Sequence, residues 1–494
     1  MIYLVGENVF SFNSGTEFSQ FERLKAFNEQ GFKTKLLLRN YSRMLAKDME
    51  KHGIAKENVI NMYDYFQETV ALERTEKPLR LLDSMALKDY HIVGIDNNIS
   101  ELRYQGKVIG KVHVMPETIG LVGVIEYFDS LGHTTLKEHW DWRGFRSMVE
   151  TYHPNGEIAT QEYLKQDGTI ALEVVHMQIG DKVLPSSWKL PNYKGQTYVF
   201  DTQDQLFTFF LNEVNASEPG IFISDRRTLD NSVANVINAK QKLAFIHSAP
   251  FVDNKNVQAG IVPSYRDVLT NQKFDQVLFP TKQAADQVKE FLPNGVAPGF
   301  APDSWVTPVK EAKQLTAQKT LVYVGRLAEE KNIGDLLKTF KYLHDQDKTL
   351  RLKLQGYFSS QAYRERLQKL VAELKIKDVV TFMNYDLDLS IYAKATLFVN
   401  TSDSEGLGMN MLESMAHAVP VISYAVPYTK DDLIKDGENG FNVKNKTPKI
   451  LANKIADVLS SPTEYQKLSN GALMTAKKHS KKAFIDAWQQ VLSF

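Results

Sequence analysis

The chain contains no cysteine among its 494 residues. Disulfide bridges and thiolate metal sites are therefore excluded, and the protein suits a reducing compartment. Long hydrophobic runs are also missing, because no apolar stretch approaches the roughly 18 residues that a membrane-spanning helix needs. An excess of charge is absent as well, since 59 basic residues balance 59 acidic ones. With a net charge of zero, the protein has no overall electrostatic attraction for nucleic acid or an anionic membrane.

The N-terminal segment, Met1 to Phe10, has a short apolar run that Gly6 and Glu7 interrupt. It lacks the basic start of a secretory signal, so it predicts a buried strand instead. We therefore expect a cytoplasmic protein that binds no nucleic acid, and peripheral contact with a membrane stays open. The chain is too long for one hydrophobic core, so two or three domains are expected.

A strand–loop–helix–strand pattern opens the chain. Ile2 to Val5 is an apolar strand, and a loop of small and polar residues around Gly15 follows it. Phenylalanine and leucine then recur at helical spacing over residues 18–27, and Thr34 to Leu38 begins the next strand. The pattern predicts a parallel sheet covered by helices.

The middle of the chain carries a periodic glycine pattern. Glycines stand twelve residues apart at positions 120, 132, 144, 156, 168 and 180. Aromatic-rich or alternating segments lie between them, and residues such as Asp167 and Asn155 give the turns good turn chemistry. Twelve residues accommodate one strand and one tight turn. The interval therefore predicts an antiparallel meander inserted into the first α/β domain.

The α/β pattern resumes after about residue 205 and predicts a second α/β domain after a loop at Pro298 to Pro302, which we interpret as a hinge. Two such halves suit a ligand bound at the carboxyl ends of parallel strands. The predicted domains are 1–84 with 201–300 for the N-terminal half, 85–200 for the meander, 301–474 for the C-terminal half and 475–494 for a final helix.

Two short segments carry the candidate chemistry. In the first, Glu405 precedes Glu413 by eight positions, in a loop that follows an apolar strand and opens a helix. Gly406 and Gly408 allow close backbone approach to a ligand, and a helix N-terminus offers N–H groups to a phosphate. The alternative is a helix cap at Glu405 and a surface charge at Glu413.

The second segment places Gly325, Arg326 and Lys331 in one loop after another apolar strand. Two cations so close together can bind a diphosphate, and an arginine can bind two of its oxygens at once. The alternative is a solvated charged loop.

In combination, these motifs resemble the retaining GT-B glycosyltransferases of family four. The resemblance covers about 205–475, and the inserted meander is similar to that of the bacterial subgroup that includes serine-rich adhesin glycosyltransferases and wall teichoic acid α-glycosyltransferases. It implies an α/β fold of the GT-B class, in which two Rossmann-like domains face a cleft and the N-terminal domain carries the meander.

The resemblance also implies roles for individual residues. Arg326 and Lys331 would bind the donor diphosphate and stabilise the leaving phosphate, Glu405 would hold the transferred sugar, and Glu413 would hold the ribose. His247, at a strand end, matches the active-site histidine of the family, although a histidine there is more often structural. The donor site would be completed by backbone at Gly15, Gly325, Gly406, Leu407, Gly408 and Met409.

No cofactor is implied, because the UDP-sugar is a substrate and no metal is required. Asp386 and Asp388 form a D-x-D match, a pattern that holds a divalent metal in other glycosyltransferases. They precede a predicted helix around Tyr392, where capping is the favoured interpretation. The lack of an obvious carboxylate dyad favours a mechanism without a protein nucleophile.

The predicted reaction is transfer of GlcNAc or glucose from a UDP-sugar to serine residues of a serine-rich surface protein. A second candidate acceptor is wall teichoic acid, that is, polyribitol or polyglycerol phosphate. Zero net charge slightly favours the protein acceptor over a polyanion. Two further hypotheses are an inactive glycosyltransferase-like subunit that binds the acceptor, and a phosphorylase. The meander is expected to dock the acceptor, a partner subunit or a second copy of the chain, because exposed sheet edges need covering.

Overall fold

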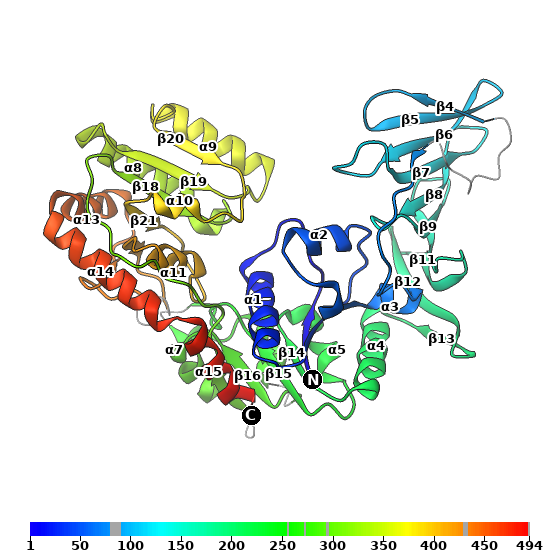
Figure 1. Cartoon of the computed structure of the whole chain (residues 1–494), viewed down its shortest axis with the longest axis horizontal. Coiled ribbons are helices and arrows are strands. Elements are labelled where there is room, and N and C mark those ends of the chain that lie inside the picture. The colour runs from blue at the N-terminus through cyan, green and yellow to red at the C-terminus, as the bar shows by residue number, and fades with distance from the viewer. Residues whose placement is uncertain (80–89, 254–255, 271–272, 293–295, 428–432, 493–494) are drawn as a thin grey trace. The chain divides into compact units, whose positions relative to one another are not determined.

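The computed structural model describes residues 1–79, 90–253, 256–270, 273–292, 296–427 and 433–492. These residues form a seven-stranded, a ten-stranded and a six-stranded sheet, with helices around the first and the third (Figure 1). No helix in the described ranges is long and apolar enough to cross a membrane. The predicted α/β class with an inserted antiparallel meander is confirmed.

The seven-stranded sheet has the order β17-β16-β15-β14-β1-β2-β3. The strand pairs β1–β14, β1–β2, β2–β3, β15–β16 and β16–β17 are all parallel. The strands are β1 (Ile2–Gly6), β2 (Thr34–Leu38), β3 (Val59–Asn61), β14 (Ile221–Ser224), β15 (Gln241–Phe245), β16 (Gln276–Phe279) and β17 (Ala297–Phe300). The helices that connect them are α1 (Gly15–Glu29), α2 (Leu45–Lys51), α3 (Met62–Gln67), α4 (Gln203–Ser217), α5 (Asp230–Ala234), α6 (Arg266–Thr270) and α7 (Lys282–Val288).

The first strand and helix form where the apolar pattern predicts them. All residues of β1 are buried, as a strand covered on both faces requires. Phe21, Leu24 and Phe27 line the buried side of α1. At the start of α1, the Glu17 carboxylate accepts hydrogen bonds from the Ser14 backbone N–H and hydroxyl, at 2.9 and 2.7 Å. This bonding fixes the point at which the chain enters the helix.

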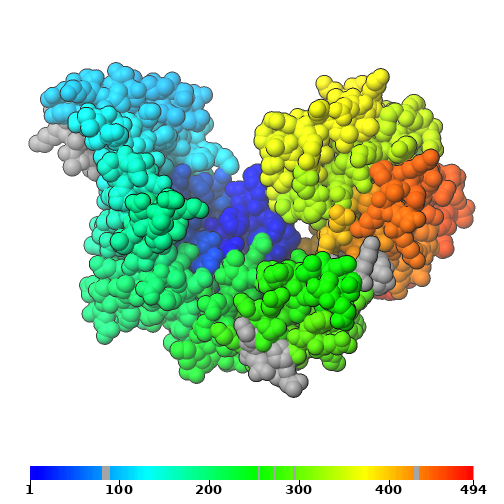
Figure 2. Space-filling view, turned by 180° about the vertical axis from the view of Figure 1, so that it is seen from behind, coloured from blue at the N-terminus to red at the C-terminus, as the bar shows by residue number. Residues whose placement is uncertain are grey.

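The ten-stranded sheet is an antiparallel meander in which each strand pairs with the next along the chain (Figure 1). Figure 2 shows its surface in cyan and blue-green. The strands are β4 (Tyr90–Gly94), β5 (Ile99–Tyr104), β6 (Lys107–Val114), β7 (Val122–Phe128), β8 (Thr134–Trp140), β9 (Arg146–Tyr152), β10 (Ile158–Leu164), β11 (Ile170–Ile179), β12 (Lys182–Tyr193) and β13 (Gln196–Phe200).

The twelve-residue glycine interval marks the turns of this meander, as predicted. All six glycines have positive φ, between 63° and 91°, which suits a residue without a Cβ. Gly144 is confined further, because a Cβ there would lie 2.1 Å from the carbonyl oxygen of Thr75. Each glycine therefore ends one strand and turns the chain into the next.

A buried arginine connects the meander to α3. Arg143 bonds Asp64 through Nη2 and Asp141 through Nε, both at 2.7 Å, and its side chain is only 7% exposed. Gln67 adds hydrogen bonds to the carbonyl oxygens of Ser147 and Leu164, at 2.8 and 2.6 Å. Because these polar groups are buried and paired, the joint holds the adjoining strands of the meander in one orientation to α3.

The six-stranded sheet has the order β20-β19-β18-β21-β22-β23, and its strands run parallel. They are β18 (Thr320–Val324), β19 (Arg351–Gln355), β20 (Val380–Met383), β21 (Leu397–Asn400), β22 (Val421–Tyr424) and β23 (Gly440–Val443). The helices in this part of the chain are α8 (Ile333–Gln346), α9 (Gln361–Glu373), α10 (Ser390–Ala393), α11 (Met409–Ala416), α13 (Pro448–Ser460), α14 (Pro462–Lys478) and α15 (Lys481–Leu492).

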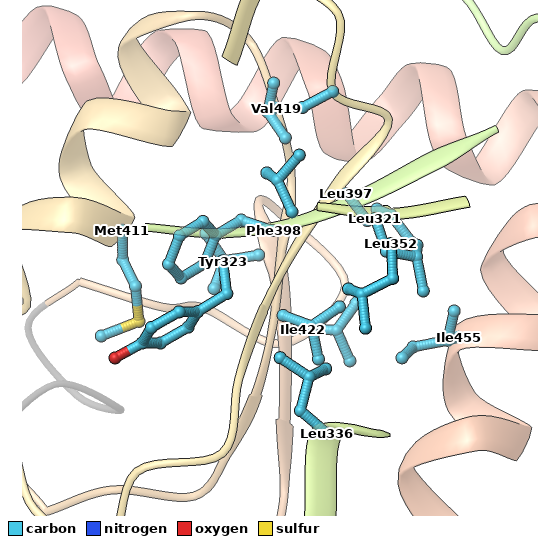
Figure 3. Packing of buried hydrophobic residues seen from close by; sticks show 14 of the residues in the cluster. Leu321, Tyr323, Leu336, Leu352, Leu397, Phe398, Met411, Val419, Ile422 and Ile455 are labelled. Atoms are coloured by element: carbon cyan, nitrogen blue, oxygen red, sulfur yellow. The ribbon is translucent and has the colours of Figure 1, made fainter. Parts of the chain in front are cut away.

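A large hydrophobic core supports this second sheet. Leu321, Leu352 and Leu397 come from three neighbouring strands and are fully buried. Figure 3 shows them packed with Leu336 of α8 and Ile455 of α13. Because the core fixes the strands, it also fixes the loops that leave their carboxyl ends.

Two predicted elements differ from the structure. The sequence predicts a loop at Pro298 to Pro302, yet Ala297–Phe300 is strand β17. A proline is tolerated there because β17 is the edge strand of the sheet within the described ranges. The predicted final helix at 475–494 is interrupted, since α14 ends at Lys478 and α15 begins at Lys481.

The chain divides into two compact units, Met1–Asn13 with Gly31–Lys242, and Ser14–Gln30 with Leu243–Phe494. The first contains the meander, and the second contains α1 and the six-stranded sheet. All predicted site residues fall in the second unit. The predicted limit at 84 and 85 lies outside the described residues, and the predicted domain limits stay a prediction.

Candidate functional site

A buried ion pair joins the two candidate segments. The Nζ atom of Lys331 lies 2.6 Å from Oε1 of Glu405, and the two side chains are 17% and 13% exposed. Lys331 ends the 3₁₀ turn Glu329–Lys331 after β18, and Glu405 stands in the loop between β21 and α11. The structure therefore brings together two residues that are 74 positions apart in sequence.

Backbone contacts hold these two loops in register. The Thr401 hydroxyl donates to the carbonyl oxygens of Lys331 and Asn332, at 2.9 and 3.1 Å. The Asp403 N–H donates to the Glu330 carbonyl at 3.1 Å. Since these groups bind the main chain, the loop geometry does not depend on the long charged side chains.

Arg326 occupies a more open position. Its Nη2 atom lies 2.5 Å from Oε1 of Glu330, and both side chains are nearly half exposed. The pair therefore contributes little to stability. The guanidinium thus bonds a carboxylate of its own loop. An anionic ligand has to compete with Glu330 for the guanidinium.

Two glycines permit close approach between the loops that follow β18 and β19. Gly356 has φ of 154°, and a Cβ at this position would lie 1.9 Å from the carbonyl oxygen of Gly325. Gly325 also has positive φ, at 144°. Asn410 of α11 donates from Nδ2 to the Val324 carbonyl at 2.8 Å. The end of β18 is thereby attached to the first turn of α11.

Two helices begin close together at this site. Gly408, with φ of 84°, is the left-handed N-cap of α11, and Leu407 before it is buried. Gly15 begins α1, and a Cβ on Gly15 would lie 3.8 Å from the sulfur of Met409. Unpaired N–H groups of helix N-termini attract anions. The family resemblance implies a phosphate site at these two N-termini, and this assignment stays a prediction.

His247 lies just past β15 and is held on two sides. A Cβ at Gly406 would lie 2.0 Å from the His247 carbonyl oxygen, so only glycine fits there. On the ring side, Nδ1 lies 2.6 Å from Oδ1 of Asp303. The structure thus places His247 against the same loop that carries Glu405.

Glu413 lies in the second turn of α11. The Tyr392 hydroxyl lies 3.1 Å from its Oε2 atom and 3.0 Å from the carbonyl oxygen of Asn410. Burial raises the pKa of Glu413 to about 7, and the nearby Glu22 carboxylate also raises it, while the Tyr392 hydrogen bond opposes the change. A carboxyl group with this pKa can exchange its proton for hydrogen bonds from a ligand's hydroxyls near neutral pH.

The raised pKa of Glu413 predicts a pH-dependent stability. The folded chain binds the Glu413 proton more tightly than the unfolded chain, whose carboxyl has the ordinary pKa of 4.5. The stabilisation is complete below pH 4.5 and is lost as the pH rises through about 7. We expect Glu413→Gln to reduce this decline in urea unfolding measured from pH 5 to 8. An equal decline in wild type and Glu413→Gln, with exposed Glu373→Gln as the control, would contradict this assignment.

The D-x-D pair makes local hydrogen bonds to the backbone two residues further along the chain. Asp388 accepts a hydrogen bond from the Ser390 N–H at 2.9 Å, at the start of α10, and Asp386 accepts one from the Asp388 N–H at 3.0 Å. The buried Gln355 donates to both of their backbone carbonyls, at 3.5 and 3.3 Å. The N-cap of α10 is Leu389 and makes no side-chain capping bond, so the capping interpretation of the D-x-D pair stays a prediction.

Three residues of the site were not predicted from the sequence. Asp303, Tyr392 and Asn410 contact His247, Glu413 and the end of β18 respectively. Their contacts span 56, 21 and 86 positions of the chain, so the pairings are not visible in a short stretch of sequence. Only Asn410 carried a local signal, since it stands inside the glycine-rich segment that precedes Glu413.

The chain thus combines two parallel sheets covered by helices with a glycine-lined site in the loops that follow β18 and β21. This combination defines the class of protein. Residues 308–473 match the family model described as Glycosyl transferases group 1. The poly(glycerol-phosphate) alpha-glucosyltransferase of Bacillus subtilis is 24% identical over 88% of this chain. The chain spans 65% of the length of that relative.

A second relative matches over nearly the full length of both chains. The GtfA subunit of the UDP-N-acetylglucosamine–peptide N-acetylglucosaminyltransferase of Streptococcus gordonii is 22% identical, over 97% of this chain and 96% of its own. The crystal structure of the pneumococcal O-GlcNAc transferase GtfA in complex with UDP and GlcNAc has the same fold. Its TM-score is 0.86 at 18% identity, over 100% of this chain and 98% of that one.

The fold is that of GT-B glycosyltransferases, and residues 308–473 carry the match to the glycosyltransferase family model. The chain resembles the bacterial subgroup of family-four glycosyltransferases whose N-terminal domain carries an inserted β-meander.

Proposed function

We propose that the chain transfers GlcNAc or glucose, with retention of configuration, from a UDP-sugar to serine residues of a serine-rich surface protein. The observation that carries the proposal is the Lys331–Glu405 pair, which joins the cationic loop to the glycine-lined start of α11. In this site a cation, a carboxylate and two helix N-termini lie together, and such a set recognises a sugar diphosphate.

Each residue has a distinct role in the proposal. Lys331 and Arg326 bind the diphosphate, and Arg326 leaves Glu330 when the donor enters. Glu405 accepts hydrogen bonds from hydroxyls of the transferred sugar, and Glu413 accepts them from the ribose. The N-termini of α1 and α11, at Gly15 and at Gly408–Met409, complete the phosphate cradle.

The proposed reaction needs no protein nucleophile. The acceptor hydroxyl attacks the anomeric carbon from the face that the nucleotide leaves, so a new C–O bond forms while the C–O bond to phosphate breaks. The acceptor proton passes to the departing phosphate oxygen, and Arg326 and Lys331 stabilise the negative charge that develops there. Trapping a sugar–protein adduct on a side chain of the site would contradict this mechanism.

Wall teichoic acid is the second candidate acceptor. The Bacillus subtilis relative, a poly(glycerol-phosphate) alpha-glucosyltransferase, favours a polyol-phosphate polymer. The Streptococcus gordonii relative matches over more of its own length and acts on a peptide, which favours the protein acceptor. The balanced charge of the chain also gives a polyanion no overall attraction.

The meander is the proposed docking element for the acceptor or for a second subunit. The Streptococcus gordonii relative is itself named as a subunit. Among the residues that the structure describes, the terminal strands β4 and β13 each pair on one side, so their outer edges suit a further chain.

An acceptor assay tests the proposal. The purified protein should be offered UDP-GlcNAc or UDP-glucose, with a serine-rich peptide or a polyol-phosphate polymer, and the products read by mass spectrometry. We expect a mass increase of one hexose or N-acetylhexosamine per modified serine, with turnover unchanged by excess EDTA because Arg326 and Lys331 provide the positive charge. Modification of the polymer alone would favour the teichoic acid candidate. Absence of transfer with every pair would contradict the proposal.

A further inference from the structure

Asp303 and His247 form a buried pair that no sequence motif predicts. Oδ1 of Asp303 lies 2.6 Å from Nδ1 of His247, and the two side chains are 5% and 10% exposed. An ionised carboxylate only accepts hydrogen bonds, so Nδ1 must carry the proton that joins them. A contact this short between two buried groups orients the ring as well as binding it.

The chain around Asp303 is fixed independently of its carboxylate. The Ala301 N–H donates to the Phe279 carbonyl at 3.0 Å, Trp488 Nε1 donates to the Pro302 carbonyl at 3.1 Å, and the Ser19 hydroxyl donates to the Asp303 carbonyl at 2.6 Å. A strand end, α15 and α1 therefore hold three consecutive residues. These hydrogen bonds fix the backbone that carries the carboxylate. The position of Asp303 therefore does not depend only on its contact with His247.

His247 is also constrained from its own side. The Ile246 N–H donates to the Leu278 carbonyl at 2.9 Å, which extends the pairing of β15 with β16. The His247 ring lies 4.2 Å from the ring of Phe245, centroid to centroid. Phe245 in turn faces the Arg23 guanidinium at 5.1 Å. Backbone, ring and Nδ1 are thus all held, so one imidazole edge is fixed toward Asp303.

We propose that Asp303 is the positioning residue of His247: it holds the proton on Nδ1 and so assigns Nε2 to the contact of His247 with the donor sugar during transfer. The inference rests on the proposed function, with His247 as the active-site histidine that the family resemblance implies. The pairing itself is independent of that function and can be measured without any substrate. Asp303 does not touch the substrate, and its effect on transfer passes entirely through the imidazole.

The first test measures the imidazole directly. In the full-length protein labelled with ¹⁵N-histidine, the His247 signals are assigned by their loss in His247→Gln. We expect Nδ1 to carry a proton in the wild type, and Asp303→Asn to change the tautomer or the Nδ1 shift. Ser19→Ala is the matched control, because it removes a hydrogen bond to Asp303 without altering the carboxylate, and its spectrum should match the wild type. A wild-type His247 with its proton only on Nε2 would overturn the proposal.

The second test separates positioning from folding. We expect Asp303→Asn to lower kcat by about 10²-fold while the Kd for UDP changes by no more than about twofold, because UDP lacks the transferred sugar. The double variant Asp303→Asn/His247→Gln should be no slower than His247→Gln alone, since both remove the same interaction. Losses that multiply in the double variant, or a parallel loss of UDP binding, would overturn the proposal. If the wild type transfers no sugar, the proposed function is contradicted. The tautomer measurement still tests whether Asp303 bonds the protonated Nδ1 of His247.

Discussion

Replacing Lys331 by methionine should lower kcat/KM for the UDP-sugar by about 10²- to 10³-fold, the usual effect of removing one electrostatic stabiliser from an active site. The reason is geometric, because the Lys331 side chain is only 17% exposed and its Nζ atom lies 2.6 Å from Glu405. Methionine retains most of the length and apolar surface of the side chain. Steady-state transfer assays with the preferred donor measure the change.

The control for this substitution is Lys338→Met, which removes an exposed lysine paired with Asp335 at 3.4 Å in the same domain. Its transfer rate should equal that of the wild type. Lys331→Met also leaves the Glu405 carboxylate without its cation, so the unfolding temperature should fall. In Lys331→Met/Glu405→Gln the unfolding temperature should recover while transfer stays low. Full activity of Lys331→Met would contradict the proposal that Lys331 binds the donor diphosphate.

Replacing Gly406 by alanine should impair both activity and stability. The new Cβ would lie 2.0 Å from the His247 carbonyl oxygen, so the backbone segments that carry His247 and Glu405 must move apart. Overpacking of this kind costs about 1–3 kcal/mol in the free energy of unfolding. Displacement of catalytic groups by about 1 Å lowers kcat by about 10²-fold. Urea unfolding and transfer assays on the same preparation measure the two effects.

Gly334→Ala is the matched control for Gly406→Ala. Gly334 lies in helix α8, and a Cβ there meets only a leucine methyl group at 3.6 Å, which is ordinary van der Waals contact. Alanine has the better helix propensity, so we expect a stability equal to or up to about 1 kcal/mol above that of the wild type. Equal behaviour of Gly406→Ala and Gly334→Ala would show that the His247 and Glu405 segments are not tightly apposed.

The parts of the fold with a strong local pattern were predictable from the sequence. The buried strand at Ile2 to Val5 and the meander turns are marked by short-range signals, namely an apolar run and glycines twelve residues apart. Strand β17 was not predictable, because Pro298 is normally a breaker and its tolerance depends on the sheet edge. Strand β23 (Gly440–Val443) has a weak local signal, because it begins with glycine and carries a polar asparagine.

In the site, too, local sequence patterns predict the loops but not the contacts between them. Lys331 and Glu405 stand in recognisable loops, but their 2.6 Å contact depends on how β18 and β21 pair in the sheet. Asp303 gives no local signal, because its role arises where the chain passes α1 and α15. Motifs therefore identify the groups that meet the substrate, and the fold identifies the groups that position them.

The stereochemistry of the product tests the central claim most directly. The wild-type protein should be incubated with UDP-[¹³C]GlcNAc or UDP-[¹³C]glucose and its acceptor, and the anomeric coupling of the transferred sugar read by NMR. A product that keeps the α configuration of the donor, formed by the wild type and lost in Lys331→Met, is the predicted result. A β-linked product, or an α-linked product formed equally well by Lys331→Met, would contradict the account.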